Sequence, residues 1–353
     1  MAATETALNV AVAVDLSDED CARITELEPR VNLIRVPGGP RASRWAGDWD
    51  GDPNFTRDAA TEKAYRASLE NADAILGLPD GGPDALANTV RANPHLRWVS
   101  TMAAGGGAQV KAAGLTDEEL KRVTFTTSAG VHGSTLAEFA IFGILAGAKN
   151  LRRLEERQAQ HLWPEQREQP QHLDEMTVLV AGLGGIGKAV AKRLKAFDAT
   201  VWGTSRSARA TDFVDRIIPL HELNQAVSEV DAIIITLPGT SETERMFDAE
   251  LFSAMKHGTL IANVGRGTVI DEDALLDSLN SGQIGFAALD VFAREPLDPA
   301  SELWDHPHVL VSPHSAGLTS QEGRRIAELF ARNATALLDG QTMCNVVDTV
   351  NFY

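Results

Sequence analysis

The stretch that decides the fold is Thr177-Val-Leu-Val-Ala-Gly-Leu-Gly-Gly-Ile-Gly-Lys-Ala-Val-Ala-Lys-Arg-Leu-Lys195. Residues 177–181 are mostly apolar and β-branched, which predicts a buried strand, and residues 188–195 have the pattern of a helix. Between them, residues 182–187 match G-x-G-x-x-G. Glycines at these positions allow a tight turn, a close approach of backbone to a ligand, and close packing of helix on strand. Together these features predict a dinucleotide-binding βαβ unit.

The glycine loop is where we expect the pyrophosphate of the dinucleotide to bind. A helix that starts there presents unpaired N–H groups and the positive end of its dipole to the phosphates. The alternative is a glycine turn without a ligand, and the position between strand and helix argues against it. The predicted cofactor-binding residues of the loop are Gly182, Gly184, Gly185, Ile186 and Gly187.

The segment after the next predicted strand, residues 200–202, bears on the choice of cofactor. An acidic residue at its end would bind the ribose of NAD and repel an added phosphate. The sequence there is Gly203-Thr-Ser-Arg-Ser207, which has no acid. We therefore expect Thr204, Ser205 and Arg206 to bind the 2′-phosphate of NADP, which is the preferred cofactor in this interpretation. NAD is the alternative, in which Arg206 is an ordinary surface charge.

The strand–helix rhythm continues on both sides of the glycine loop. Six predicted strands in the second part of the chain imply a doubly wound parallel sheet, which binds ligands at the carboxyl ends of its strands. They are residues 177–181, 200–202, 232–236, 259–263, 285–289 and 308–312. A smaller α/β unit is expected before them, with strands at residues 10–16, 72–79 and 95–100.

Composition excludes several classes of protein. The chain has 353 residues, of which 44% are hydrophobic, enough for two domains with separate cores. The net charge of −17 disfavours binding to nucleic acid or to an anionic membrane. We expect no membrane span and no secretory signal, and two cysteines are too few for a disulfide framework or a metal site. A cytoplasmic protein without a metal is the simplest interpretation.

Three motifs follow later predicted strands and carry candidate catalytic groups. They are Asn263-Val-Gly-Arg-Gly267, Leu289-Asp-Val-Phe-Ala-Arg-Glu-Pro296 and Ser312-Pro-His314. Reduction of a 2-keto acid needs a cation for the carboxylate, a proton donor beside the keto oxygen, and a partner that orients the donor. Arg266, His314 and Glu295 supply these three groups. Each of them alone could be a surface or loop residue, but their arrival at one sheet edge favours a catalytic site.

The glycine loop and these three motifs, in this order, resemble the D-isomer-specific 2-hydroxyacid dehydrogenase family. The resemblance is strongest from about residue 177 to 316 and extends more weakly through residues 128–138. It implies that His314 is the acid/base, that Glu295 orients it, and that Arg266 holds the carboxylate and carbonyl of the substrate. The resemblance further implies that Asp290 lies near the nicotinamide and the acid/base pair. It also implies that the backbone N–H groups around Ala104, Gly105 and Gly106 cradle the substrate carboxylate.

The expected architecture is two α/β domains, each with a Rossmann-like or flavodoxin-like parallel sheet, and a cleft between them. Residues 1–125 and 316–353 would form the substrate domain, and residues 126–315 the dinucleotide-binding domain. The resemblance implies a homodimer, with the apolar helix at residues 134–149 as a candidate interface. A small acid such as glyoxylate or hydroxypyruvate is the expected substrate. The alternatives are a phosphoglycerate dehydrogenase-like enzyme and a non-catalytic dinucleotide-binding scaffold or corepressor.

Overall fold

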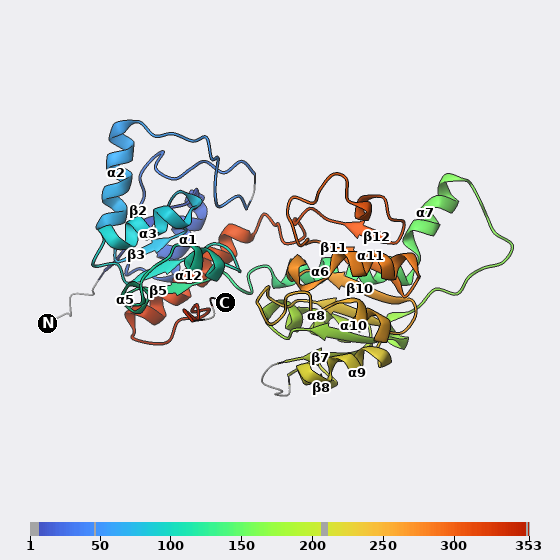
Figure 1. Cartoon of the computed structure of the whole chain (residues 1–353). Coiled ribbons are helices and arrows are strands. Elements are labelled where there is room, and N and C mark those ends of the chain that lie inside the picture. Colours follow the sequence, from blue (N-terminus) through green and yellow to red (C-terminus); the bar gives the residue numbers. More distant parts are fainter. Residues whose placement is uncertain (1–6, 46, 206–210, 351, 353) are drawn as a thin grey trace. The chain divides into compact units, whose positions relative to one another are not determined.

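The computed structural model describes residues 7–45, 47–205, 211–350 and 352. The chain divides into two compact units (Figure 1). Unit 1 comprises Met1–Val131 and Leu318–Tyr353, and unit 2 comprises His132–Gly317. None of the helices in the described ranges combines the length and the apolar character needed to span a bilayer.

Unit 1 is built on a five-stranded parallel sheet with the order β2-β1-β3-β4-β5. Its strands are β1 (Leu8–Val12), β2 (Val31–Ile34), β3 (Ala74–Leu76), β4 (Trp98–Ser100) and β5 (Thr124–Thr126). Its helices are α1 (Asp18–Leu27), α2 (Ala59–Glu70), α3 (Pro83–Ala92), α4 (Gly107–Ala112), α5 (Asp117–Arg122) and α12 (Glu322–Leu338). The order is that of flavodoxin-like domains.

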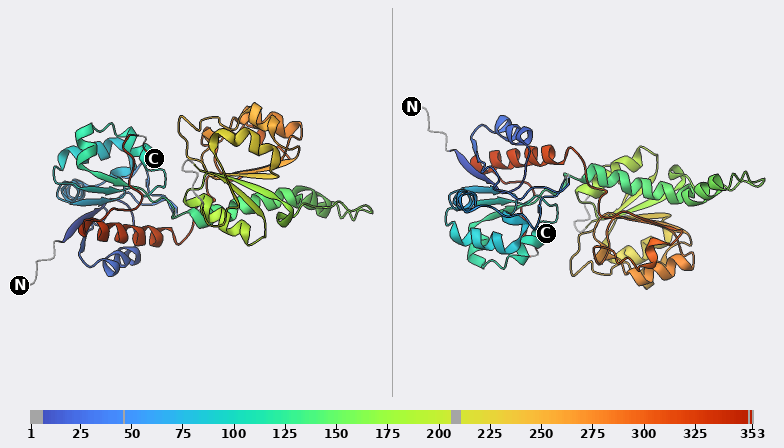
Figure 2. Two further views of the ribbon diagram at one scale, coloured as in Figure 1. Left: turned by 90° about the horizontal axis from the view of Figure 1, so that it is seen from below. Right: turned by 90° about the horizontal axis from the view of Figure 1, so that it is seen from above.

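Two apolar cores lie on opposite faces of this sheet. Residues of α1 and α12 form one core with β1, β3 and β4, and residues of α2 and α3 form the other (Figure 2). The ring of Trp98 stacks on Phe330 of α12, with centroids 4.4 Å apart. The second chain segment of unit 1 therefore supplies part of its core.

Unit 2 contains a seven-stranded parallel sheet with the order β12-β11-β10-β9-β6-β7-β8. Its strands are β6 (Thr177–Ala181), β7 (Thr200–Thr204), β8 (Arg216–Ile218), β9 (Ala232–Ile235), β10 (Thr259–Asn263), β11 (Ile284–Leu289) and β12 (Val309–Val311). Its helices are α6 (Gly133–Ala148), α7 (Leu151–Ala159), α8 (Gly185–Lys195), α9 (Leu223–Ala226), α10 (Ala249–Ala254) and α11 (Glu272–Asn280). Unit 1 has a short 3-10 turn at Pro79–Gly81. Unit 2 has such turns at Leu173–Glu175, Leu220–Glu222, Val227–Glu229, Gly267–Val269 and Glu302–Trp304.

The sheet of unit 2 is covered on both faces, as a parallel sheet requires. One core contains α6 and α8, and the other contains α9, α10 and α11 (Figure 2). The strand order reverses at β6, which pairs with β7 on one side and β9 on the other. Ligands of doubly wound sheets bind at such a point, outside the carboxyl ends of the strands.

The prediction of two parallel α/β sheets is confirmed, with differences at the edges. The sheet of unit 2 has a seventh strand, β8, which was not predicted. In unit 1 the first strand ends at Val12, earlier than the predicted residue 16. Ala13, Val14 and Leu16 are buried in the loop that follows it, which is why their apolar pattern resembles a continued strand.

Candidate active site

The glycine loop joins β6 to α8 in a conformation that requires glycine. Gly182 has φ of +101°, a region that other residues rarely adopt. A Cβ on Gly187 would overlap with the carbonyl oxygen of Gly182, so helix and loop can only pack this closely without a side chain. A Cβ on Gly184 would meet nothing within 4 Å. The backbone at Gly184 is thus open toward a ligand, and Gly185 and Ile186 begin α8 with unpaired N–H groups.

Hydroxyl groups from two neighbouring strands fix the glycine loop. The N–H of Gly182 donates to Oγ1 of Thr204 at 2.9 Å, and the Thr236 hydroxyl donates to the carbonyl oxygen of Gly182 at 2.6 Å. Thr204 is buried, so the structure places this predicted cofactor-binding side chain beneath the loop. Ser205 is partly exposed directly after it, and Arg206 lies outside the described residues. Neither threonine was predicted to hold the loop.

Arg266 stands in an ordered turn after β10. The buried Asn263 accepts a hydrogen bond from the N–H of Gly265 at 3.0 Å and donates one to the carbonyl oxygen of Arg266 at 3.1 Å. The Arg266 side chain is exposed, and its guanidinium donates to the carbonyl oxygen of Gly265 at 2.7 Å. The motif asparagine therefore shapes the turn that presents the arginine.

The side chains of Glu295 and His314 contact each other directly in unit 2. Nδ1 of His314 lies 2.7 Å from Oε2 of Glu295. A carboxylate can only accept, so this contact places a proton on Nδ1 and leaves Nε2 for another partner. Oε1 of Glu295 accepts the N–H of Phe292 at 3.0 Å, which fixes the carboxylate on its own loop. Half of the His314 side chain is exposed, at 52%, so Nε2 can reach a small molecule.

Asp290 lies under the loop that carries His314. Its Oδ1 accepts three hydrogen bonds, from the Ser312 hydroxyl at 2.6 Å and from the N–H groups of Ser315 and Ala316 at 2.9 and 3.0 Å. His314 has φ of +52°, an unfavourable conformation that these bonds help to maintain. Burial raises the pKa of Asp290, although the hydrogen bond from Ser312 opposes the shift. Asp290 was predicted to lie near the nicotinamide and the acid/base pair, and in the structure it holds the loop that carries His314.

The three motifs leave adjacent strands at one edge of the sheet. β10, β11 and β12 are neighbours, and Arg266, Glu295 and His314 follow their carboxyl ends in that order. A Cβ on Gly267 would overlap with the main chain of Phe292, so the arginine turn packs directly on the glutamate loop. The glycine loop follows β6 at the same edge of the same parallel sheet.

The predicted substrate loop belongs to unit 1 and lies between β4 and α4. A Cβ on Gly106 would overlap with the hydroxyl of Thr101, so glycine is required there. The N–H of Gly106 donates to the carbonyl oxygen of Ala103 at 3.2 Å. Among the residues that the structure describes, the N–H groups of Ala104 and Gly105 donate to no protein acceptor. Two backbone donors are therefore available in this loop for an anion.

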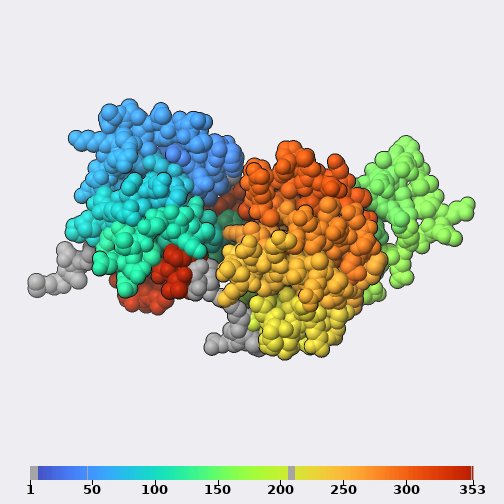
Figure 3. All heavy atoms as spheres, viewed as in Figure 1, coloured from blue at the N-terminus to red at the C-terminus, as the bar shows by residue number. Residues whose placement is uncertain are grey.

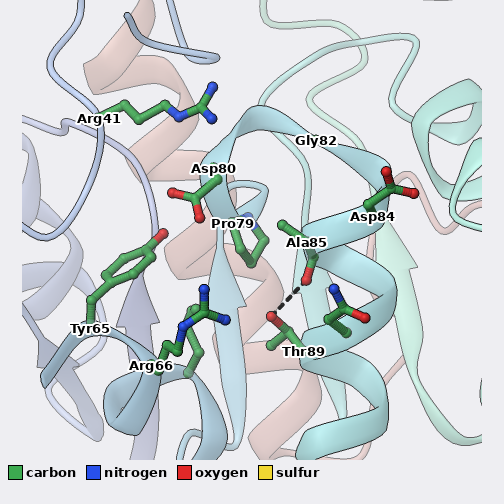
Figure 4. A pocket seen from close by; sticks show the side chains of 11 residues that line it. Arg41, Tyr65, Arg66, Pro79, Asp80, Gly82, Asp84, Ala85 and Thr89 are labelled. Carbon is green, nitrogen blue, oxygen red and sulfur yellow. Dashed lines mark hydrogen bonds between the residues drawn. The ribbon is translucent and has the colours of Figure 1, made fainter. Parts of the chain in front are cut away.

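Unit 1 also contains a polar cavity of about 360 Å³ between α2 and α3 (Figure 4). Its lining includes Arg41, Tyr65, Arg66 and Asp80, and none of the predicted site residues. Asp80 pairs with Arg57, and Arg66 pairs with Glu62 on α2. The charges at this cavity are largely matched within the protein. Within the described part of the chain, no cluster of three or more His, Cys, Asp or Glu residues could hold a metal ion.

Comparisons with known proteins agree with this geometry. Residues 141–316 match the model of the NAD-binding domain of D-isomer-specific 2-hydroxyacid dehydrogenases. The chain is 31% identical over 322 residues to a glyoxylate reductase of Thermofilum pendens, covering 89% of this chain and 92% of the relative. It is 36% identical over 184 residues to glyoxylate/hydroxypyruvate reductase A of Serratia proteamaculans, covering 52% of this chain and 58% of that protein.

Solved structures extend the similarity to nearly the whole chain. A D-isomer-specific 2-hydroxyacid dehydrogenase of Xanthobacter autotrophicus, in complex with NADPH, is similar with a TM-score of 0.77 and 27% identity, covering 98% of this chain and 100% of that one. An NADPH-dependent glyoxylate/hydroxypyruvate reductase of Sinorhizobium meliloti, in complex with NADP and sulfate, gives 0.76 and 25%, covering 98% and 99%. The chain therefore belongs to the D-isomer-specific 2-hydroxyacid dehydrogenases, a family of NAD(P)-dependent oxidoreductases.

Proposed function

We propose that this enzyme reduces a small 2-keto acid, such as glyoxylate or hydroxypyruvate, to the D-2-hydroxy acid. The observation that carries the proposal is the His314–Glu295 pair, 2.7 Å apart, at the sheet edge that also bears Arg266 and the glycine loop. An oriented imidazole is the group that a carbonyl reduction needs as proton donor. The glyoxylate and hydroxypyruvate reductases among the relatives support the choice of substrate.

Each residue of the site has a separate role in the proposed reaction. The reduced nicotinamide, when bound, supplies the hydride for the keto carbon. His314 donates a proton from Nε2 to the keto oxygen, while Glu295 accepts the hydrogen bond from Nδ1 and keeps the ring in position. Arg266 binds the carboxylate of the substrate through a guanidinium that stays charged at any working pH. In unit 1, the N–H groups of Ala104 and Gly105, which have no acceptor among the described residues, are the other candidate donors for a substrate carboxylate.

We assign the cofactor to unit 2 and the substrate to unit 1. The sequence predicted the dinucleotide-binding domain at residues 126–315 and the substrate domain at residues 1–125 and 316–353, whereas the units divide at Val131 and Gly317. The open backbone at Gly184 and the start of α8 suit a pyrophosphate. We further propose that NADP is preferred over NAD, because no acidic residue stands directly after β7 and the sequence has an arginine, Arg206, two positions after its end.

Cofactor preference is tested at Arg206. Arg206→Ala should raise the KM for NADPH by about 10- to 100-fold, which corresponds to the loss of a charge-assisted hydrogen bond, and leave the KM for NADH unchanged. Lys192→Ala, which removes an exposed charge from α8, is the matched control. Equal KM values for NADPH in Arg206→Ala and the wild type would exclude this arginine and leave the reaction class standing.

The reaction itself is tested by following the loss of reduced-nicotinamide absorbance with a panel of 2-keto acids. NADPH and NADH are used in parallel, and turnover of glyoxylate or hydroxypyruvate is expected. Bulky 2-keto acids serve as the comparison. Binding of a dinucleotide without turnover of any acid would contradict the proposal and favour a non-catalytic scaffold.

We also propose a cytoplasmic homodimer. Exposed apolar side chains gather on α6, on α7 and in the segment after it, with Phe142, Leu154, Leu162 and Trp163 each about half exposed or more. α7 and the following residues extend from the body of unit 2 (Figures 1 and 3). A second copy would cover these side chains, since monomers rarely leave such patches in water. Sedimentation of the wild type and of Trp163→Ser tests this, and a monomeric wild type would exclude the dimer.

A further inference from the structure

Glu272, the first residue of α11, lies beside the loop that carries Glu295. Its Oε1 accepts the N–H of Ala293 at 2.6 Å. Ala293 is two residues before Glu295 in the segment Val291–Pro296. The sequence motifs gave no indication of Glu272, because it belongs to a helix that starts between two of them.

In the segment Val291–Pro296, the side chains of Val291 and Phe292 are buried, whereas residues 293–296 are exposed. The N–H of Phe292 donates to Glu295, which is part of the same segment. Among the hydrogen bonds of the described residues, the bond from Ala293 to Glu272 ties the main chain of this segment to a neighbouring helix. The start of the segment is held by Phe292, which packs in the apolar core of unit 2 and against Gly267. The exposed part of the segment, which includes Glu295, is thus tied to α11 through the Glu272 carboxylate.

Glu272 is partly buried, and its surroundings are unfavourable for a charge. Burial raises the pKa of Glu272, the hydrogen bond from Ala293 opposes the shift, and the charges of Asp273 and Glu295 add to it. A glutamine could accept the same hydrogen bond without a charge. A substitution to glutamine thus separates the role of the acceptor from the role of the charge.

We propose that Glu272 is a positioning residue, which holds Val291–Pro296 so that Glu295 stays within hydrogen-bond distance of His314. The inference rests on the proposed function, because it gives Glu295 and His314 their roles in proton transfer. Catalytic groups lose efficiency when their supports allow displacements of about 1 Å. Removal of the Glu272 acceptor should therefore slow the chemical step and leave dinucleotide binding unchanged.

The test compares three variants of Glu272 in the full-length enzyme. Glu272→Ala should lower kcat by about 10-fold or more, with the Kd for NADPH within about twofold of wild type. Glu272→Gln, which keeps an oxygen acceptor, should restore most of the kcat. Glu272→Asp keeps the charge but shortens the side chain, so its kcat should fall as in Glu272→Ala. If Glu272→Ala folds poorly, Glu272→Asp still tests the inference. Asp273→Ala, an exposed neighbour in the same helical turn, should behave as wild type.

Glu295→Gln separates failure of this inference from failure of the proposed function. If Glu295→Gln lost activity while Glu272→Ala and Glu272→Asp kept the wild-type kcat, the positioning role would be wrong and the proposed function would stand. If Glu295→Gln kept full activity as well, the assignment of the catalytic pair would be wrong. Equal losses in Glu272→Gln and Glu272→Ala would show that the charge, and not the hydrogen bond, is required, which also contradicts the inference.

Discussion

At the scale of single residues, the site depends on side chains whose backbone is held in unusual conformations. His314 has φ of +52°. The two residues after His314 donate their N–H groups to the carboxylate of Asp290. Asp290 thus holds the backbone of the loop, and Glu295 holds the ring. The loop conformation, and not the histidine alone, makes the proton donor.

His314→Asn should lower kcat by roughly 10²- to 10⁴-fold, the usual contribution of a general acid. Asparagine tolerates a left-handed backbone well, so the loop should keep its conformation. The Kd for NADPH, measured by fluorescence titration, should stay near the wild-type value. His308→Asn changes an exposed histidine and is the control. Residual activity near wild type would remove His314 from the mechanism.

Arg266→Lys should lower kcat/KM for the keto acid by about 10- to 100-fold, because a single ammonium replaces a bidentate guanidinium. Steady-state kinetics with varied keto acid measure the effect, and the KM for NADPH serves as an internal reference. Arg91→Lys, at an exposed surface pair with Glu119, should change nothing. A normal kcat/KM in Arg266→Lys would contradict the role of the arginine as the carboxylate clamp.

At the scale of elements, the glycines of the loop before α8 are required for different physical reasons. Gly187 cannot hold a Cβ because the carbonyl of Gly182 occupies its place, whereas the space beside Gly184 is open. Gly187 is therefore required for packing within the protein. Gly184 leaves room for a ligand.

Gly187→Ala should therefore lower both the thermal stability and the affinity for NADPH, since the loop must move away from α8. Gly184→Ala should leave the Tm within about 2 °C of wild type, because surface substitutions without clashes change stability little, yet still weaken NADPH binding by about 10-fold. Differential scanning fluorimetry and fluorescence titration measure the two quantities. If Gly184→Ala bound NADPH normally, the backbone at this glycine would not face the pyrophosphate.

The elements also show what a sequence can predict and what it cannot. The strand–glycine–helix unit at Thr177–Lys195 was predictable because apolar period and turn chemistry agree there. The edge strands β2, β5 and β8 were not predicted, since each is only three or four residues long and contains polar residues. Motif residues located the sheet edge of the site. The support by Thr204, Asp290 and Glu272 depends on contacts between distant segments, which spacing along the chain does not encode.

At the scale of the whole molecule, unit 1 is held together across a large gap in the sequence. Glu28, at the end of α1, accepts hydrogen bonds from Arg30 at 2.7 Å and from Thr335 of α12 at 2.7 Å. Arg30 also pairs with Asp339 at 2.8 Å. Hydrogen bonds from Arg30 lower the pKa of the buried Glu28 to about 2, although burial opposes the shift.

Because the pKa of Glu28 is depressed in the folded state, its contribution to stability is present above its ordinary value of 4.5 and is lost as pH falls toward 2. Glu28→Gln should lower the free energy of unfolding of unit 1 by roughly 2 kcal/mol at pH 7 and flatten its decline over that acidic range. Urea unfolding followed by circular dichroism, fitted with a separate transition for each unit, measures this. Glu26→Gln, whose side chain is 69% exposed, is the control. The same acidic decline in both variants would exclude Glu28 as its source.

The insertion of unit 2 within unit 1 has a consequence for synthesis of the protein. During translation, unit 2 can fold once Gly317 has left the ribosome, while the sheet of unit 1 still lacks α12. Until then Trp98 has no Phe330 to stack on, and the apolar face that Ile326 and Ala331 will cover is open to water. The sheet of unit 1 is therefore synthesised long before α12, the helix that covers one of its faces. Until α12 is made, the nascent chain exposes an apolar surface of the kind that chaperones bind. A stop codon just before Leu318 should give a protein whose second unit is folded and whose first unit aggregates.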